Sequence, residues 1–245
     1  MPSAWQNPWL KANRGIAMVK ISVCMCTKNE QESIGAVIGG IRRVLGEEAE
    51  IVITDSSKDE TPKIAKDMGA VVLTQPPTGY GKALANSLRN ARGDLIATTD
   101  CDGTYPMDQL PVLIKMANEY DVVSGSRLLG KKRVASMPFF NEFGNRAFAA
   151  ICNLLFGSKF TDVTTGMRVF KSEVIRSIDW KENIGLSIEL LVKPHLAGFK
   201  VAEIPIQYHE RIGNTKLDPI HGGTEMLKSI IRMKMDEKSL RKAKR

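Results

Sequence analysis

Apolar runs alternate with segments of helical periodicity along the first half of the chain. The apolar runs "KISVCMC", "EIVITD", "AVVL" and "DLIATTD" predict strands at 20–26, 50–55, 70–73 and 94–100. Helical spacing predicts helices at 31–45, 60–68, 81–91 and 108–120, and "DVVSGSR" at 121–127 continues the pattern as a further strand. Because such alternation is typical of a parallel sheet covered on both faces, the sequence predicts an α/β fold with a Rossmann-like, mostly parallel sheet.

Polar and acidic loops follow three of the predicted strands. The first strand is followed by "TKNE", the second by "DSSKDET" and the fourth by "DCDGTYP". Each loop alone could be a turn or a helix cap, because Ser, Thr, Asn and Asp commonly serve both purposes. The carboxyl ends of parallel strands meet at one edge of a sheet, however, and ligands gather there. The three loops together therefore predict one polar crevice at that edge.

Length and composition are those of a globular protein. The chain has 245 residues, 43% hydrophobic and 25% charged, which suits one large α/β domain or two small ones. Its longest nearly apolar stretches, "ISVCMC" and "FAAICNLLF", fall far short of the roughly 20 residues that span a bilayer, and the N-terminus lacks the apolar core of a signal peptide. Four cysteines without a CxxC pair favour reduced thiols in a cytoplasmic protein over disulfides or zinc.

The formal net charge of +8 is concentrated at the C-terminus. Residues 226–245 contain eight Lys and Arg against two acids, a net of +6, so the rest of the chain carries +2. A basic tail can meet nucleic acid, an anionic membrane surface or only water. A tail that binds nucleic acid is expected to interleave aromatic and basic side chains. This tail has no aromatic residue, which ranks a basic nucleic-acid-binding protein as the lowest alternative.

The segment "PPTGYGKALA" at 76–85 resembles nucleotide-binding loops only in part. It is not a P-loop, since Ala83 follows Lys82 where a P-loop has a hydroxyl, and it lacks the third glycine of the dinucleotide fingerprint. We expect its glycines to allow close backbone packing, and Lys82 is a candidate contact to a substrate.

Asp100 and Asp102 form a DxD sequence directly after a predicted buried strand. Two carboxylates at that position are costly unless a cation lies between them. Mg²⁺ and Mn²⁺ prefer oxygen ligands and leave positions open for phosphate oxygens, so the pair predicts a site for one of these ions that also holds a diphosphate. The metal would neutralise the charge that develops on a departing diphosphate.

Six segments between Lys20 and Leu217 are similar, in order and at consistent spacing, to motifs of glycosyltransferase family 2. Within that family they resemble the dolichyl-phosphate mannose synthase-like group. The segments are "MCTKNEQESI", "IVITDSSKDET", "GYGKALANSLRNARGDLIATTDCD", "VVSGSRL", "DVTTGMRVFKSEVI" and "IELLVKPHLAGFKVAEIPIQYHERIGNTKL". Departures from the family pattern include Cys26 and Lys28, where the opening motif usually has Pro and Tyr. The resemblance implies a GT-A type fold and a single displacement that inverts the anomeric carbon.

The same resemblance implies roles for individual residues. The nucleotide base and ribose would contact Thr27, Asn29, Glu30 and Asp55, and Lys82 of the "GYGK" segment joins them as the candidate contact to the nucleotide sugar. Asp100 and Asp102 would hold the metal and the donor diphosphate. The phosphates of donor or acceptor would face Arg127, Arg168, Arg211 and Lys216, and Glu189 would lie near the acceptor. The candidate catalytic residues are Asp100, Asp102, Arg127, Arg211 and Lys216.

The leading hypothesis for the reaction is transfer of a hexose from a nucleotide-diphosphate sugar to dolichyl or another polyprenyl phosphate. GDP-mannose, UDP-glucose and UDP-N-acetylglucosamine all remain open as donors. A lipid phosphate is already anionic near neutral pH, because the second pKa of a phosphate monoester is about 6, so this acceptor needs no general base. The alternative is a soluble acceptor such as phosphoglycerate or a growing glycan.

Two segments favour a lipid acceptor. Residues 137–157 place seven large apolar side chains, four of them phenylalanine, around one predicted helix. The tail from residue 226 has an apolar stripe with basic residues between, which predicts a helix that either lies on an anionic membrane or packs on the domain. We therefore expect an extension at 1–17, a single catalytic domain at 18–220 and a basic amphipathic tail at 221–245. The extension is either an interfacial segment or the product of an upstream start codon, and we expect peripheral association with the cytoplasmic face of a membrane.

Overall fold

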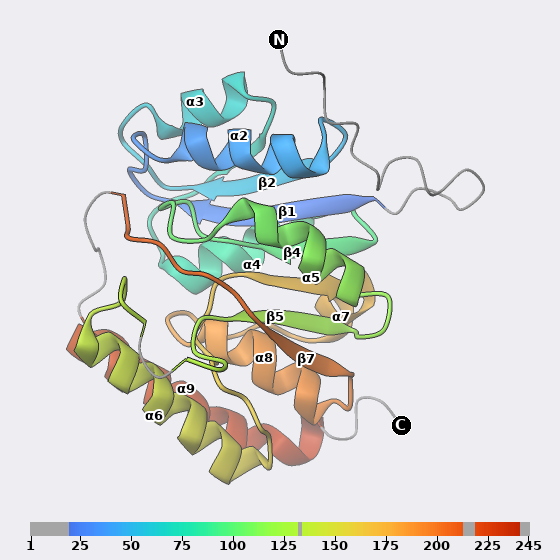
Figure 1. Cartoon of the computed structure of the whole chain (residues 1–245), viewed down its shortest axis with the longest axis vertical. Coiled ribbons are helices and arrows are strands. Elements are labelled where there is room, and N and C mark those ends of the chain that lie inside the picture. The colour runs from blue at the N-terminus through green and yellow to red at the C-terminus, as the bar shows by residue number, and fades with distance from the viewer. Residues whose placement is uncertain (1–19, 132–133, 213–218, 241–245) are drawn as a thin grey trace.

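A computed structural model describes residues 20–131, 134–212 and 219–240 (Figure 1). Its strands are β1 (Ile21–Thr27), β2 (Glu50–Asp55), β3 (Val71–Thr74), β4 (Leu95–Thr98), β5 (Val122–Ser126), β6 (Arg168–Lys171) and β7 (Val201–Pro205). Its helices are α2 (Ile34–Leu45), α3 (Thr61–Asp67), α4 (Tyr80–Asn90), α5 (Leu110–Met116), α6 (Phe139–Phe156), α7 (Ser172–Ser177), α8 (Leu186–Leu196) and α9 (Pro219–Leu240), with a 3₁₀ turn at Met107–Gln109. The strands and helices expected in the first half of the chain are confirmed.

The described strands form one sheet in the order β3-β2-β1-β4-β6-β5-β7. All neighbouring pairs are parallel except those of β6, which runs antiparallel to β4 and β5. The predicted mostly parallel sheet is thus confirmed, with one reversed strand that the apolar pattern did not reveal. Because β6 is reversed, the loop that precedes it, at 162–167, lies at the same edge as the carboxyl end of β4.

Helices cover both faces of the sheet (Figure 1). Residues of β1 alternate between the two resulting cores: Val23 and Met25 pack with α2 and α5, whereas Cys24 packs with α4 and α8. These β1 side chains are fully buried, which is why the strand reads as a continuous apolar run. The sheet therefore provides a rigid frame for the loops at its carboxyl edge.

Helices α6 and α9 lie side by side at the end of the molecule away from α2 and α3 (Figure 1). Helix α9 buries Ser229, Ile230 and Met233, the last two in the same core as α8. The tail helix is thus packed on the domain, which is the second of the two alternatives that its sequence allowed. Residues 1–17 and 241–245 lie outside the described residues. Among the helices that the structure describes, none is both long and apolar enough to cross a bilayer.

Candidate active site

A cleft of about 470 Å³ opens at the carboxyl edge of the sheet. The loops after β1, β2 and β4 line it, as the polar strand ends predicted, through Thr27, Ser56 and both acids of the DxD sequence. The beginnings of α4 and α8 and the side chain of Met226 on α9 complete the lining. Residues far apart in sequence therefore converge on one crevice.

Asp102 lies in a tight hairpin that continues from β4 and is 3% exposed. Its Oδ1 accepts hydrogen bonds from the backbone N (3.0 Å) and Oγ1 (2.6 Å) of Thr104. Its Oδ2 lies 2.5 Å from a guanidinium nitrogen of Arg211. Gly103 turns the hairpin with a φ of +76°, where any residue with a Cβ would be strained and its Cβ would lie 2.9 Å from Cδ1 of Ile212. The contacts with Thr104 thus hold the Asp102 carboxylate in a position where its second oxygen binds a positively charged group, here Arg211.

Asp100 faces the cleft from the end of the same strand segment. No hydrogen bond to its carboxylate is found among the described residues, and the backbone of Gly166 lies so close that a Cβ there would be 2.7 Å from Oδ2. Burial, and then the negative charge of Asp102, raise the pKa of Asp100 to about 7. A carboxylate that faces the cleft beside a second carboxylate is an arrangement that a bound cation would stabilise.

Tyr105 fixes the position of the loop that packs on Asp100. Its hydroxyl oxygen accepts a hydrogen bond from the backbone N of Gly166 at 2.7 Å, and its ring meets the edge of Tyr208 at 5.6 Å between centroids. Oγ1 of Thr98 donates to the carbonyl of the same glycine at 2.7 Å. The "DVTTGMR" segment is therefore held against the DxD hairpin by side chains that the sequence did not single out.

The two acids fit a divalent ion. The structure describes no group of three His, Cys, Asp or Glu side chains that could hold a metal alone. Asp100 and Asp102 would therefore supply two carboxylate ligands, and oxygens of a substrate diphosphate and water would supply the rest, as is usual for Mg²⁺ and Mn²⁺. When bound, such an ion supplies positive charge to a leaving diphosphate.

The residues predicted for the nucleotide lie together at the ends of β1 and β2. Thr27 and Glu30 line the cleft. Asp55 is 1% exposed and accepts hydrogen bonds from Oγ1 of Thr27 at 2.7 Å and from Oγ of Ser57 at 2.6 Å, so it braces the two strand ends. Asn29 has a φ of +54° and donates its backbone N–H to Oγ of Ser57 at 2.7 Å. Asp55 and Asn29 support this end of the cleft without lining it.

The predicted basic residues do not all reach the cleft. Arg211 lines it, whereas Arg127 makes a bidentate pair with buried Asp162, at 2.7 and 2.8 Å, and lies over the ring of Tyr208. This pairing holds the pKa of Asp162 below its ordinary value, despite its burial. Arg168 is 1% exposed and donates to Oγ of Ser124 and to the carbonyl of Val163. Lys216 lies outside the described residues.

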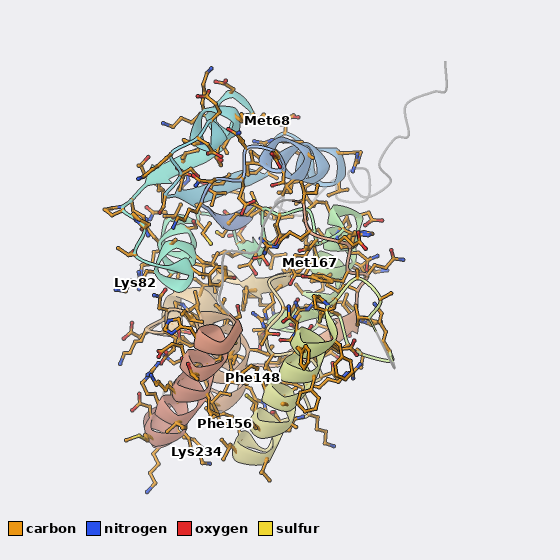
Figure 2. All side chains as sticks on the ribbon, turned by 90° about the vertical axis from the view of Figure 1, so that its left-hand side faces the viewer. Met68, Lys82, Phe148, Phe156, Met167 and Lys234 are labelled. Carbon is orange, nitrogen blue, oxygen red and sulfur yellow. The ribbon has the colours of Figure 1, made fainter. Side chains whose placement is uncertain are left out.

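Two further positions differ from what the resemblance implied. Glu189 is fully buried on α8, pairs with Lys193, and accepts hydrogen bonds from the backbone N of Lys181 and of Glu182. Its carboxylate thus anchors the loop before α8 and does not line the cleft. Lys82 is exposed on α4 (Figure 2) and also lies outside the lining. On both helices other residues face the cleft: Tyr80 and Ala83 on α4, and Ser187 on α8.

Sequence reasoning missed several lining residues. They are Tyr80, Asn183, Ile184, Ser187 and Met226. Tyr80 lies within the "GYGK" segment, next but one to the predicted Lys82, and Met226 begins the apolar stripe of the tail. Asn183, Ile184 and Ser187 lie in a stretch without a motif, so only the three-dimensional packing identifies them.

Comparisons with known proteins agree with this geometry. The family model described as glycosyl transferase family 2 matches residues 22–179. The chain is 45% identical over 219 residues to the dolichyl-phosphate hexose transferase of Haloferax volcanii, covering 89% of this chain and 95% of that one. It is 26% identical over 213 residues to the undecaprenyl-phosphate mannosyltransferase of Micrococcus luteus, covering 81% and 88%.

A solved structure shares the fold. Glucosyl-3-phosphoglycerate synthase from Mycobacterium tuberculosis, in complex with Mn²⁺, UDP-glucose and phosphoglyceric acid, superposes with a TM-score of 0.69. The match covers 89% of this chain and 80% of that one, at 22% sequence identity. At this level of identity the likeness establishes the architecture.

Proposed function

The chain belongs to glycosyl transferase family 2, and we propose that it transfers a hexose from a nucleotide-diphosphate sugar to a polyprenyl phosphate such as dolichyl phosphate. The observation that carries the proposal is the DxD hairpin, which presents Asp100 and Asp102 to a cleft beside Arg211. Support for the lipid acceptor comes from the 45% identity to a protein named a dolichyl-phosphate hexose transferase.

The donor is proposed to lie with its nucleotide at the ends of β1 and β2 and its diphosphate at the hairpin. Thr27, Glu30 and Ser56 line the first region, and Asp100 and Asp102 the second. The two acids would hold Mg²⁺ or Mn²⁺. Arg211, which pairs with Asp102 and lines the same cleft, can orient phosphate oxygens through paired N–H groups. GDP-mannose, UDP-glucose and UDP-N-acetylglucosamine remain the candidate donors.

The proposed chemistry is a single displacement. A phosphate oxygen of the acceptor attacks the anomeric carbon and forms a new C–O bond, and the bond from that carbon to the diphosphate oxygen breaks. The products are a sugar-linked lipid phosphate with inverted configuration and a nucleoside diphosphate, which takes the electron pair. The acceptor oxygen already carries negative charge near neutral pH, so positioning and charge neutralisation provide the catalysis.

A membrane-facing surface is part of the proposal. Helix α6 exposes Phe139, Phe140 and Phe143 at its beginning, with Phe140 84% exposed. The neighbouring helix α9 exposes Leu227, Ile231 and Met235, and carries basic side chains between them. Phe148 and Phe156 fill the space between the two helices instead (Figure 2). The exposed aromatic and aliphatic side chains favour contact with a bilayer, whereas Lys228, Arg232 and Lys234 each pair with an acid and so add little net positive charge to this surface.

The main alternative is a soluble acceptor. The solved structures with the same fold include a glucosyl-3-phosphoglycerate synthase and a mannosyl-3-phosphoglycerate synthase. Phosphoglycerate is therefore one of the acceptors to be assayed. A nucleic-acid-binding role is less well supported, because α9 packs on the domain and residues 226–245 contain no aromatic side chain.

The decisive assay crosses the three donors with three acceptors, each with Mg²⁺ or Mn²⁺. The acceptors are a short polyprenyl phosphate, phosphoglycerate and a free oligosaccharide. The proposal expects a chromatographically separable lipid-linked sugar with one of the donors, and release of one nucleoside diphosphate for each sugar transferred. Product with the soluble acceptors alone would overturn the lipid assignment, and metal-independent transfer would overturn the role of the DxD acids.

A further inference from the structure

Helix α9 forms part of the cleft as well as part of the outer surface. Met226 lines the cleft, and Ile230 and Met233, one and two turns further along, are buried in the core. Leu227 and Ile231, each about 100° around the helix from Met226 and Ile230, are 42% and 51% exposed. A change in the position of α9 would therefore alter the wall of the cleft.

Glu182 ties α9 to the loop that precedes α8. Its Oε1 accepts a hydrogen bond from Nε of Arg232 at 2.9 Å, and its Oε2 accepts one from the second guanidinium nitrogen at 2.6 Å. Oγ of Ser229 donates to the same Oε2 at 2.5 Å. Side-chain hydrogen bonds from Arg232 hold the pKa of Glu182 below its ordinary value. Gly185 lets this contact close, because a Cβ there would overlap the side chain of Ser229.

The same loop reaches the cleft on its other side. Oδ1 of Asn183 accepts a hydrogen bond from the backbone N of Gly81 at 3.0 Å, at the beginning of α4, and Nδ2 of Asn183 donates to the carbonyl of Thr78 at 3.2 Å. Ile184 and Ser187, which follow directly, line the cleft. The loop at 181–185 and the first turn of α8 thus connect α9 to α4 through residues that line the cleft.

The wall formed by this loop lies opposite the nucleotide end. Figure 1 shows β1 and β2 toward one end of the long axis and α8 and α9 toward the other, with β4 between them. A diphosphate held at Asp100 and Asp102, with its nucleotide at the ends of β1 and β2, points its sugar away from those two strands. Ile184, Ser187 and Met226 therefore face the sugar or the acceptor.

We propose that Glu182 is a positioning residue that, by holding Ser229 and Arg232 of α9, sets the acceptor-facing wall of the cleft formed by Ile184, Ser187 and Met226. This inference rests on the proposed function for the identity of the acceptor. It makes α9 a mechanical link between the outer apolar surface and the site, because the helix contributes side chains to both.

The test compares Glu182→Gln with Glu225→Gln. Glu225 pairs with Lys228 at 2.7 Å within α9, and among the residues that the structure describes no hydrogen bond or ion pair joins its carboxylate to the loop, so it is a matched control. We expect Glu182→Gln to raise the KM for polyprenyl phosphate about five- to tenfold, because it loses charged hydrogen bonds to a half-exposed arginine. The KM for the donor should stay within about twofold. The control should leave both values unchanged.

A charge-reversed pair separates positioning from general stability. Arg232→Glu alone should raise the acceptor KM as Glu182→Gln does, and Glu182→Arg combined with Arg232→Glu should restore much of the loss. Equal rises in donor and acceptor KM, an unchanged acceptor KM, or a double variant no better than the single ones would each overturn the inference. If the wild type uses only a soluble acceptor, the proposed function fails first, and the same KM comparison with that acceptor still tests the wall.

Discussion

Replacing Asp102 with asparagine tests the DxD hairpin without removing its internal hydrogen bonds. The amide oxygen of asparagine can still accept from the backbone N and Oγ1 of Thr104, which lie 3.0 and 2.6 Å from Oδ1. The negative charge is lost, and with it the pair with Arg211 and one ligand of the proposed metal. The substitution therefore removes the negative charge of the side chain while keeping its size and its hydrogen bonds with Thr104.

The expected magnitudes differ for folding and for transfer. Arg211 is 34% exposed, so its pair with Asp102 is partly screened, and we expect the free energy of unfolding to fall by about 1–2 kcal/mol. The loss of a metal ligand removes several kcal/mol of charge stabilisation from the transition state, which corresponds to a fall of about 10³-fold in kcat/KM. Asp102 is buried and hydrogen-bonded, so substitution by alanine should cost more stability than a solvated loop acid would.

The assay measures transfer of a labelled sugar, Mn²⁺-dependent nucleotide binding by calorimetry, and unfolding in denaturant. Asp108→Asn, at an exposed acid just beyond the hairpin, is the matched control and should leave all three values unchanged. A variant at Asp102 that keeps transfer within tenfold of wild type, with its Mn²⁺ dependence intact, would refute the reasoning.

Three further predictions concern packing, the outer surface and pH. Ile230→Ala should lower the free energy of unfolding by about 2–5 kcal/mol in denaturant titration, whereas half-exposed Ile231→Ala should change it by less than about 0.5 kcal/mol. Phe140→Ser should weaken co-sedimentation with vesicles that contain phosphatidylglycerol and leave transfer to a short acceptor unchanged, and Val112→Ser, at another exposed apolar residue, should change neither measurement. Because the folded-state pKa of Asp100 is raised to about 7, the native state binds more protons than the unfolded state between about pH 4 and 7. Stability in EDTA should therefore fall as pH rises through that range, and Asp100→Asn should remove the decline, which a parallel pH titration of both proteins would check.

Much of the fold could be predicted from local patterns. Buried parallel strands give continuous apolar runs, and the acids at their carboxyl ends stand out against those runs. For this reason the polar ends of β1, β2 and β4 predict one crevice from the sequence, and the structure has one there. The reversal of β6 could not be predicted in this way, because a four-residue strand has the same apolar pattern in either direction.

Partners outside the motifs explain why the positions of individual side chains could not be predicted. Arg127 faces a buried carboxylate, Asp162, 35 residues away, and Glu189 turns inward to Lys193 and two backbone N–H groups. A motif gives the residue type at such a position but not the group that neutralises it. The apolar stripe of the tail helix α9 likewise fits a membrane surface or a protein core equally well. The packing of Ile230 and Met233 places that part of the stripe in the core.

The most direct test of the account is a crystal structure of the protein soaked with Mn²⁺ and the nucleotide sugar that it uses. The account predicts the ion bound to the carboxylates of Asp100 and Asp102 and to the diphosphate, with the nucleotide at the ends of β1 and β2. A nucleotide sugar and Mn²⁺ bound elsewhere, with Asp102 still paired to Arg211, would contradict it.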